Sequence, residues 1–138
     1  RKKIVLIDES YNANPMSMKA TIEYFNSYKK NNSNKKILIL GDMLELGKFE
    51  KKLHIQLNKY INFDKIDLIL TCGDLIKNLS IYFNNNKKII HFNSITDIQS
   101  YLLNILDEND IILTKCSNST QVNNFTSRLK NEYLYKKI

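Results

Sequence analysis

The sequence predicts an α/β fold, namely an open, mostly parallel, Rossmann-like sheet of about five or six strands with helices on both faces. Short runs of consecutive apolar residues alternate along the chain with longer amphipathic stretches, which is typical of repeated strand–helix–strand units. The apolar runs are continuous, with no polar residue at every second position, as expected for strands buried on both faces of a parallel sheet.

Six strand candidates occur in chain order. They are Ile4 to Ile7, Ile37 to Leu40, Leu68 to Leu70 with Ile66 just before it, Ile89 to Phe92, Ile111 to Leu113, and an edge strand at Tyr133 to Ile138.

Five helices are predicted between these strands from apolar residues spaced three or four apart. The first begins well, because Asn14 suits the N-cap and Pro15 suits the first helical position. The marker residues are Met18, Ile22 and Phe25; Leu53, Leu57 and Ile61; Leu75, Leu79 and Phe83; Ile98, Leu102 and Ile105; and Val122, Phe125 and Leu129.

Length and composition predict one globular domain over residues 1–138. A hydrophobic content of 43% supplies one core, and no apolar run approaches the roughly 18 residues needed to cross a bilayer. We expect no signal peptide and no membrane partner, because the apolar run after Arg1 turns acidic at Asp8. The two cysteines form no disulfide framework and no metal-ligand spacing. These features favour a cytoplasmic monomer without a bound metal of its own.

The net charge of +7 raises the question of a nucleic-acid partner. The lysines occur as scattered doublets, whereas a nucleic-acid-binding protein gathers them into a stripe with aromatic residues between. We therefore expect no nucleic-acid partner. An anionic nucleotide or UDP-sugar would also favour positive charge. The doublets are Lys29-Lys30, Lys35-Lys36, Lys51-Lys52, Lys87-Lys88 and Lys136-Lys137.

Polar side chains follow the predicted strands at one end of the sheet. Asp8 to Pro15 follows the first strand, Gly41 to Gly47 the second, Thr71 to Asp74 the third and Thr114 to Asn118 the fifth. Ligands of open α/β sheets bind at the carboxyl ends of the strands. The asymmetry therefore predicts a binding site at this edge.

Two common phosphate-binding motifs are excluded. In Gly41 to Lys48, five residues separate the glycines and Phe49 follows Lys48, where a P-loop has four residues and then a hydroxyl side chain. The loop after the first strand contains no glycine, so it lacks the dinucleotide-binding fingerprint. A nucleotide bound at this edge would therefore have its phosphates held by another domain.

Three segments resemble the carboxy-terminal domain of Mur ligases, over essentially the whole chain. Ile7 to Met18 (IDESYNANPMSM) is similar to a hallmark of the members that add D-alanyl-D-alanine to a UDP-muramoyl tripeptide, usually DDSYNANP followed by a Ser-Met pair. Ile39 to Gly47 (ILGDMLELG), with His54 on the next helix, is similar to a second hallmark. Leu113 to Asn118 (LTKCSN) stands where the family usually has LVKGSR.

This resemblance implies one domain of an ATP-dependent amide ligase of peptidoglycan synthesis. In the family, an amino-terminal domain binds the UDP-sugar, and a central domain holds most of the ATP and Mg²⁺. ATP phosphorylates the carboxylate of UDP-N-acetylmuramoyl-tripeptide, and the amine of D-alanyl-D-alanine attacks the acyl phosphate. Residues 1–138 alone are expected to be inactive.

The resemblance also assigns roles to polar residues of the edge. Glu9 stands where relatives carry an acid near the ribose, and Asn12 where they place a polar residue near the phosphates. Lys115 and Ser117 are candidates for the dipeptide carboxylate or the acyl phosphate, as a cation and a hydroxyl donor. The full nucleotide-binding set is Asp8, Glu9, Tyr11 and Asn12, and the substrate-binding set is Asn14, Asp42, Glu45, Lys115 and Ser117.

Three positions depart from the family pattern. Glu9 replaces an Asp, which moves the carboxylate outward by roughly 1.5 Å. Asn118 replaces an Arg, which removes a permanent charge. Cys116 replaces a Gly, which is awkward if the backbone there has positive φ.

Structural roles remain open for several of these residues. Asn14 suits a helix cap whatever the function, Asp42 suits a cap of the following segment, and Glu45 suits a solvated charge. We expect His54 to be a packed or capping histidine, and Cys72 and Cys116 to be small buried residues.

Two other functions also remain open. A phosphate-accepting signalling domain has an acidic pair, a hydroxyl and a Lys after its strands, which Asp8-Glu9, Thr71 and Lys115 mimic. In that fold, however, the phosphorylated Asp ends the third strand, and here Asp42 follows the second. The other possibility is a stand-alone nucleotide- or sugar-binding module.

Overall fold

The computed structural model describes residues 2–83, 85–118 and 120–137 and confirms the predicted α/β architecture. Six strands form one sheet in the order β4-β3-β2-β5-β1-β6, and its strand pairs are parallel. Each predicted strand is present, although Ile138 lies outside the described residues. The strands are β1 (Lys3–Glu9), β2 (Lys36–Leu40), β3 (Leu68–Cys72), β4 (Ile89–Phe92), β5 (Ile111–Lys115) and β6 (Leu134–Lys137).

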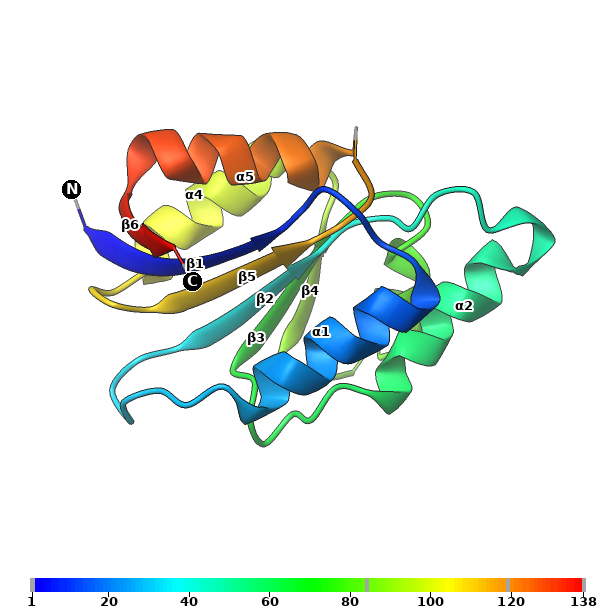
Figure 1. Cartoon of the computed structure of the whole chain (residues 1–138), viewed down its shortest axis with the longest axis horizontal. Coiled ribbons are helices and arrows are strands. Elements are labelled where there is room, and N and C mark those ends of the chain that lie inside the picture. The colour runs from blue at the N-terminus through cyan, green and yellow to red at the C-terminus, as the bar shows by residue number, and fades with distance from the viewer. Residues whose placement is uncertain (1, 84, 119, 138) are drawn as a thin grey trace.

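Helices cover both faces of the sheet (Figure 1). On one face pack α1 (Pro15–Ser27), α2 (Glu50–Gln56) and α3 (Lys77–Tyr82), and on the other pack α4 (Ile95–Ile105) and α5 (Gln121–Glu132). Alternate residues of a strand enter the two cores: Leu38 and Leu40 join the first, whereas Ile37 and Ile39 join the second. No helix in the described ranges is long and apolar enough to cross a membrane.

The predicted start of α1 is confirmed in detail. The Asn14 side chain accepts a hydrogen bond from the Ser17 backbone N–H at 2.9 Å, and the Ser17 hydroxyl accepts one from the Asn14 N–H at 3.0 Å. Together they form a reciprocal capping box, which ends the loop after β1 at Asn14 and starts α1 at Pro15.

Two predicted helices differ from the structure. The second ends at Gln56 and continues only as a 3₁₀ turn, η2 (Leu57–Lys59), so Ile61 is buried outside any helix. The third begins at Lys77, after Leu75, and it is Ile76, fully buried, that joins the core together with Leu79. The apolar spacing identified these helices but not their ends, because loop contacts decide where each one stops.

Gly41 allows β2 and β5 to leave the sheet side by side. A Cβ atom at Gly41 would lie 2.7 Å from the Cys116 Cβ and 2.9 Å from the Val122 Cβ. The Gly41 N–H also donates to the Lys115 carbonyl at 2.9 Å. The close approach of these backbones therefore requires a residue without a side chain at position 41.

We predict that Gly41→Ala lowers the free energy of unfolding by about 1–3 kcal/mol, because the added methyl group overpacks the contact with Cys116 and Val122. Cys116→Gly should restore part of this loss by removing the nearest atom. Gly47→Ala is the matched control: Gly47 has φ of +62° and no neighbour within 4 Å, so its loss should be unaffected by Cys116→Gly. Chemical denaturation of the three single variants, and of the two double variants that combine Cys116→Gly with each alanine, measures this; additive losses at Gly41 and Cys116 would contradict the account.

His54 fastens the loop after β2 to α2. Its Nδ1–H donates to the Glu50 carbonyl at 2.6 Å, and its Nε2 accepts from the Met43 N–H at 2.9 Å. Only the neutral imidazole satisfies both bonds, because a protonated ring has no acceptor for Met43. Burial lowers the pKa of His54, against an opposing effect of the hydrogen bond to Glu50. The expected structural role of His54 is confirmed.

Acidification should therefore destabilise the chain. The folded pKa of His54 lies below the ordinary value near 6.5, so the unfolded chain binds the proton first as the pH falls. The stability contributed by neutral His54 is present above about pH 6.5 and is lost progressively below it. We predict that His54→Gln, which keeps an acceptor for Met43, has a smaller drop in unfolding free energy between pH 7.5 and 5.5. An equal drop in unfolding free energy in the wild type and in His54→Gln would exclude His54 as a cause of the loss of stability in acid.

Candidate functional site

The connections after the strands change face at β5, and we call this point the β5 reversal. It creates a crevice at the carboxyl ends of the strands. β5 lies between β1 and β2, with Lys115 opposite both Glu9 and Leu40. The chain leaves β1 and β2 toward α1 and α2 on one face, but leaves β5 toward α5 on the other (Figure 1). Ligands of open α/β sheets bind at such a reversal.

A surface hollow of about 440 Å³ occupies this position. The loops after β1, β2 and β5 line it together, although they are far apart in sequence. The lining residues are Tyr11, Asn12, Ala13, Asn14, Leu44, Glu45, Leu46, Ser117 and Asn118. Five of the nine residues assigned by sequence line this hollow, whereas Asp8, Glu9, Asp42 and Lys115 do not.

Asp8 is engaged within the domain. Its carboxylate forms an ion pair with Lys130 of α5 and accepts hydrogen bonds from the Ser10 N–H at 3.0 Å and the Ser10 hydroxyl at 2.6 Å. Burial alone would raise the pKa of Asp8, but the hydrogen bonds from Lys130 and Ser10 outweigh it, and the net shift is downward. Asp8 is therefore a stable carboxylate that ties the end of β1 to α5.

Glu9 is the last residue of β1, and because successive strand residues alternate, its side chain lies on the opposite face of the sheet from that of Asp8. The exposed Tyr11 hydroxyl hydrogen-bonds to its carboxylate, and this bond raises the pKa of Tyr11. Glu9 also lies close enough to Lys115 to favour its protonated form. Glu9, Tyr11 and Lys115 therefore form one polar group beside the hollow.

Asn12 and Asn14 have different environments. The Asn14 side-chain oxygen caps α1, so the structural role considered for this residue is confirmed. The exposed Asn12 side chain makes no hydrogen bond to residues in the described part of the chain, while its backbone carbonyl accepts from the Lys115 ammonium at 2.8 Å. Asn12 thus presents a free amide to the hollow from a fixed backbone.

Lys115 is buried although it was assigned to a ligand. Its side chain is 3% exposed, and burial lowers its pKa against the opposing effect of Glu9. Its ammonium points beneath the loop, at the Asn12 carbonyl.

Ser117 and Asp42 connect loops. The Ser117 hydroxyl accepts from the Leu44 N–H at 3.0 Å and donates to the Ala13 carbonyl at 3.3 Å, while the Ser117 N–H donates to the Asp42 carbonyl at 2.9 Å. The Asp42 carboxylate accepts from the N–H groups of Leu75 and Ile76 at 3.1 and 2.8 Å. Asp42 therefore caps the segment after β3, and not the segment that follows it in sequence.

Glu45 is exposed at the rim of the hollow, in an uncommon backbone conformation. Its φ is 63°, in the left-handed region that non-glycine residues seldom adopt. Such strain persists only where neighbouring structure holds it, and here the adjacent Leu44 N–H is bound by Ser117.

The replacement of the usual Gly by Cys116 is accommodated. Among described non-glycine residues only Glu45 and Asn109 have positive φ, so position 116 does not need glycine. The Cys116 thiol is fully buried and donates to the Ser10 carbonyl at 3.4 Å, and burial raises its pKa to about 11. Cys72 is also buried with a pKa of about 11, so both thiols are protonated packing groups, as expected.

Two contributors were missed from the sequence, both on α5. Asn123 donates to the Ser10 carbonyl at 2.6 Å, and Lys130 pairs with Asp8. Both lie on the polar side of an amphipathic helix pattern, where a packing role has no sequence signal.

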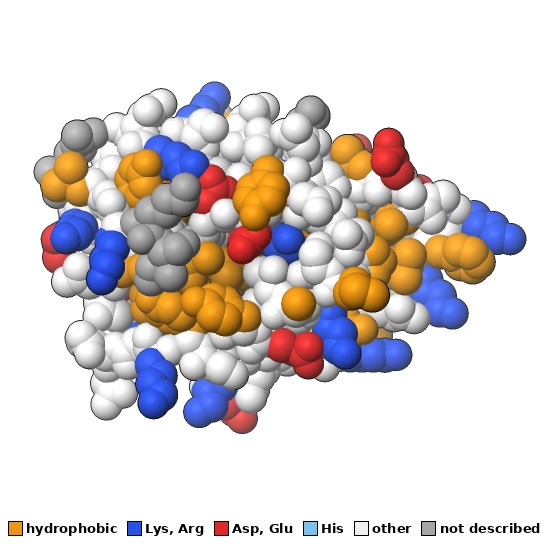
Figure 2. Space-filling view, viewed as in Figure 1, with side chains coloured by type: hydrophobic (Ala, Val, Ile, Leu, Met, Phe, Trp, Pro, Cys, Tyr) orange, Lys and Arg blue, Asp and Glu red, His pale blue; other side chains and the backbone are white. Residues whose placement is uncertain are grey.

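The residues that mimic a phosphate-accepting signalling domain, Asp8-Glu9, Thr71 and Lys115, do not come together in one site. The acidic pair on β1 and the hydroxyl at Thr71 on β3 are separated in the sheet by β5 and β2. Thr71 is also buried and bonded to Ser80 and His91, at 2.8 Å each. On the face shown in Figure 2, Lys and Arg side chains are spread along the outline with Asp and Glu among them. Within the described residues, no group of three His, Cys, Asp or Glu could hold a metal.

Comparisons with known proteins agree with this geometry. The family model described as "Mur ligase, glutamate ligase domain" matches residues 1–118. The UDP-N-acetylmuramoyl-tripeptide–D-alanyl-D-alanine ligase of Bacillus subtilis is 35% identical over 115 residues, which is 81% of this chain and 25% of that ligase. The ligase of the same name from Buchnera aphidicola (subspecies Acyrthosiphon pisum) is 34% identical over 120 residues, 86% of this chain and 25% of that ligase. The chain thus spans a quarter of the length of these relatives.

A solved structure shares the fold. The MurF ligase from Thermotoga maritima in complex with ADP superposes with a TM-score of 0.75 at 23% identity, over 96% of this chain and 30% of that one. Six parallel strands in one sheet, the loops that converge at its carboxyl edge and the match over residues 1–118 lead to one assignment: the chain belongs to the Mur ligase family, as its carboxy-terminal domain.

Proposed function

We propose that this chain is the carboxy-terminal domain of an ATP-dependent ligase that joins D-alanyl-D-alanine to UDP-N-acetylmuramoyl-tripeptide in the cytoplasm. The observation that carries the proposal is the hollow at the β5 reversal, lined by the loop from Tyr11 to Asn14. The relatives that match this chain bear the name of that reaction.

In this proposal the hollow completes a site whose other walls belong to further domains. The part of the full-length protein outside this chain, about three quarters in the matched relatives, would supply the phosphate loop, the Mg²⁺ ligands and the UDP-sugar site, since the loops here lack a glycine-rich cradle. Attack by the dipeptide amine on an acyl phosphate needs the reacting groups aligned and water kept out. A domain that closes over bound ATP meets both needs.

Two side chains at this edge of the sheet are suited to the nucleotide. Glu9 has a carboxylate suited to accept from two adjacent ribose hydroxyls, and the Tyr11 hydroxyl lies close to that carboxylate. The exposed Asn12 amide donates toward phosphate oxygens without disturbing its own carbonyl, which Lys115 holds. Asp8, which is paired with Lys130, acts in this proposal by holding Ser10 and the start of the loop.

The proposal is tested with the full-length protein that contains this chain. Purified enzyme should form UDP-N-acetylmuramoyl-pentapeptide only with ATP, Mg²⁺, the tripeptide substrate and D-alanyl-D-alanine all present. Asn12→Ala should lower kcat by about a hundredfold if the amide positions the reacting phosphate. Asn32→Ala, at an exposed turn on the opposite edge, is the matched control and should leave kcat unchanged.

Two results would count against the proposal. Absence of ligation by the wild-type enzyme would reject the reaction itself. Equal kinetics of Asn12→Ala and Asn32→Ala would show that the hollow is not part of the active site, but would not contradict the ligase reaction itself.

A further inference from the structure

Lys115 and Ser117 were assigned to the dipeptide carboxylate or the acyl phosphate, but both are already bound within the domain. The Lys115 ammonium donates to the Asn12 carbonyl at 2.8 Å, and its side chain is 3% exposed. The Ser117 hydroxyl donates its proton to the Ala13 carbonyl and accepts from the Leu44 N–H. A carboxylate ligand would have to displace these bonds, and Ser117 has one hydroxyl proton only.

The contacts of this segment share a pattern. Lys115, Cys116 and Ser117 reach the carbonyls of Asn12, Ser10 and Ala13 in turn. The last residue of β5 and the two that follow it therefore hold the backbone of the loop after β1, and Ser117 also holds the loop after β2 through Leu44.

The bond from Lys115 is the strongest candidate among these for fixing the loop. It is charge-assisted, and such bonds are roughly twice as strong as bonds between neutral groups. A buried ammonium that loses its acceptor keeps its desolvation cost, so the bond to Asn12 is maintained once the domain is folded. Glu9, opposite Lys115 in the sheet, holds the charge from the other side.

From these contacts we infer that Lys115 is a positioning residue for the nucleotide, acting through the Asn12 backbone, and not a ligand of the dipeptide. This inference rests on the proposed ligase function. Lys115 fixes the Asn12 carbonyl, the fixed carbonyl sets the direction of the Asn12 side chain, and that side chain reaches the hollow where the nucleotide is proposed to bind.

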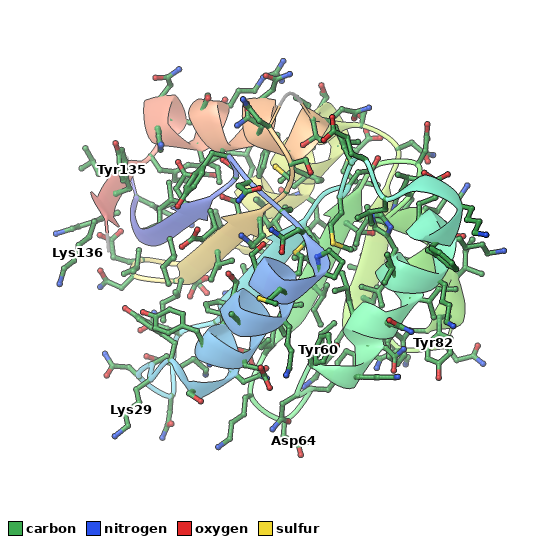
Figure 3. The ribbon with its side chains drawn as sticks, turned by 45° about the vertical axis from the view of Figure 1, so that its right-hand side comes forward. Lys29, Tyr60, Asp64, Tyr82, Tyr135 and Lys136 are labelled. Atoms are coloured by element: carbon green, nitrogen blue, oxygen red, sulfur yellow. The ribbon has the colours of Figure 1, made fainter. Side chains whose placement is uncertain are left out.

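The chain offers a matched control for the loss of a buried lysine. Lys36 is 2% exposed, and its ammonium donates to the Tyr28 and Asn26 carbonyls at 2.7 and 3.1 Å, where α1 ends. It lies at the opposite edge of the sheet, beside Lys29 and Asp64, which Figure 3 shows pointing outward from that edge. Lys36→Met and Lys115→Met thus each remove a buried ammonium that is bonded to backbone carbonyls, but only Lys115 holds a loop that lines the hollow.

The first test is kinetic and uses the full-length ligase. Lys115→Met should lower kcat by about tenfold or more and raise the KM for ATP, with the KM for D-alanyl-D-alanine within about twofold of wild type. Lys36→Met should leave all three within about twofold at a temperature where both variants are folded. A raised KM for the dipeptide in Lys115→Met, with kcat retained, would overturn the inference, as would equal losses in the two variants.

The second test does not depend on the reaction. Hydrogen exchange measured without substrates should become faster over residues 10–14 in Lys115→Met but not in Lys36→Met. Unchanged exchange there would overturn the positioning role. Faster exchange in an enzyme that fails to ligate would instead uphold the positioning role and reject the proposed function.

Discussion

The arrangement of this domain depends on the placement of β5 between β1 and β2. Lys115 pairs in parallel with Glu9 on one side and with Leu40 on the other, so β1, β2 and β5 end side by side at the same edge of the sheet. Since the backbones diverge toward opposite faces just beyond that edge, the polar groups of three loops meet over β5. Gly41 permits this approach, because a side chain there would collide with Cys116 and Val122.

The polar residues of the edge divide into those that hold loops and those that face outward. Asp8, Asp42, Lys115 and Ser117 are each bonded to backbone or side chains of other segments. Asn12 and Glu45 are exposed at the hollow, and Tyr11 shares a bond with Glu9 there. A rim that is rigid before the ligand binds loses less entropy on closure, which favours an aligned reaction. The buried bonds therefore keep the rim rigid, and the exposed side chains on that rim face the ligand.

Much of the fold could be predicted from the sequence, because its signals are local. Continuous apolar runs marked the first five strands, and Asn14 with Pro15 marked the start of α1. The end of α2 and the burial of Ile76 were not predicted, since contacts between distant segments decide them. The strand order had no local signal either, although the position of β5 determines the site.

The candidate site was predicted in outline but not in its division of roles. The polar residues at the strand ends could be identified, and five of the nine line the hollow. Whether Lys115 turns outward to a ligand or inward to Asn12 depends on the path of a loop about a hundred residues away, which spacing alone does not encode. Asp42 likewise caps Leu75 and Ile76, more than thirty residues further along the chain.

The most direct measurement is hydrogen exchange of the full-length protein with and without a non-hydrolysable ATP analogue and Mg²⁺. The account predicts slower exchange on binding over residues 9–14, 42–47 and 116–118, with no change over residues 29–36 at the opposite edge. Protection confined to the opposite edge, or absent from all three loops, would contradict the claim that the β5 reversal faces the nucleotide.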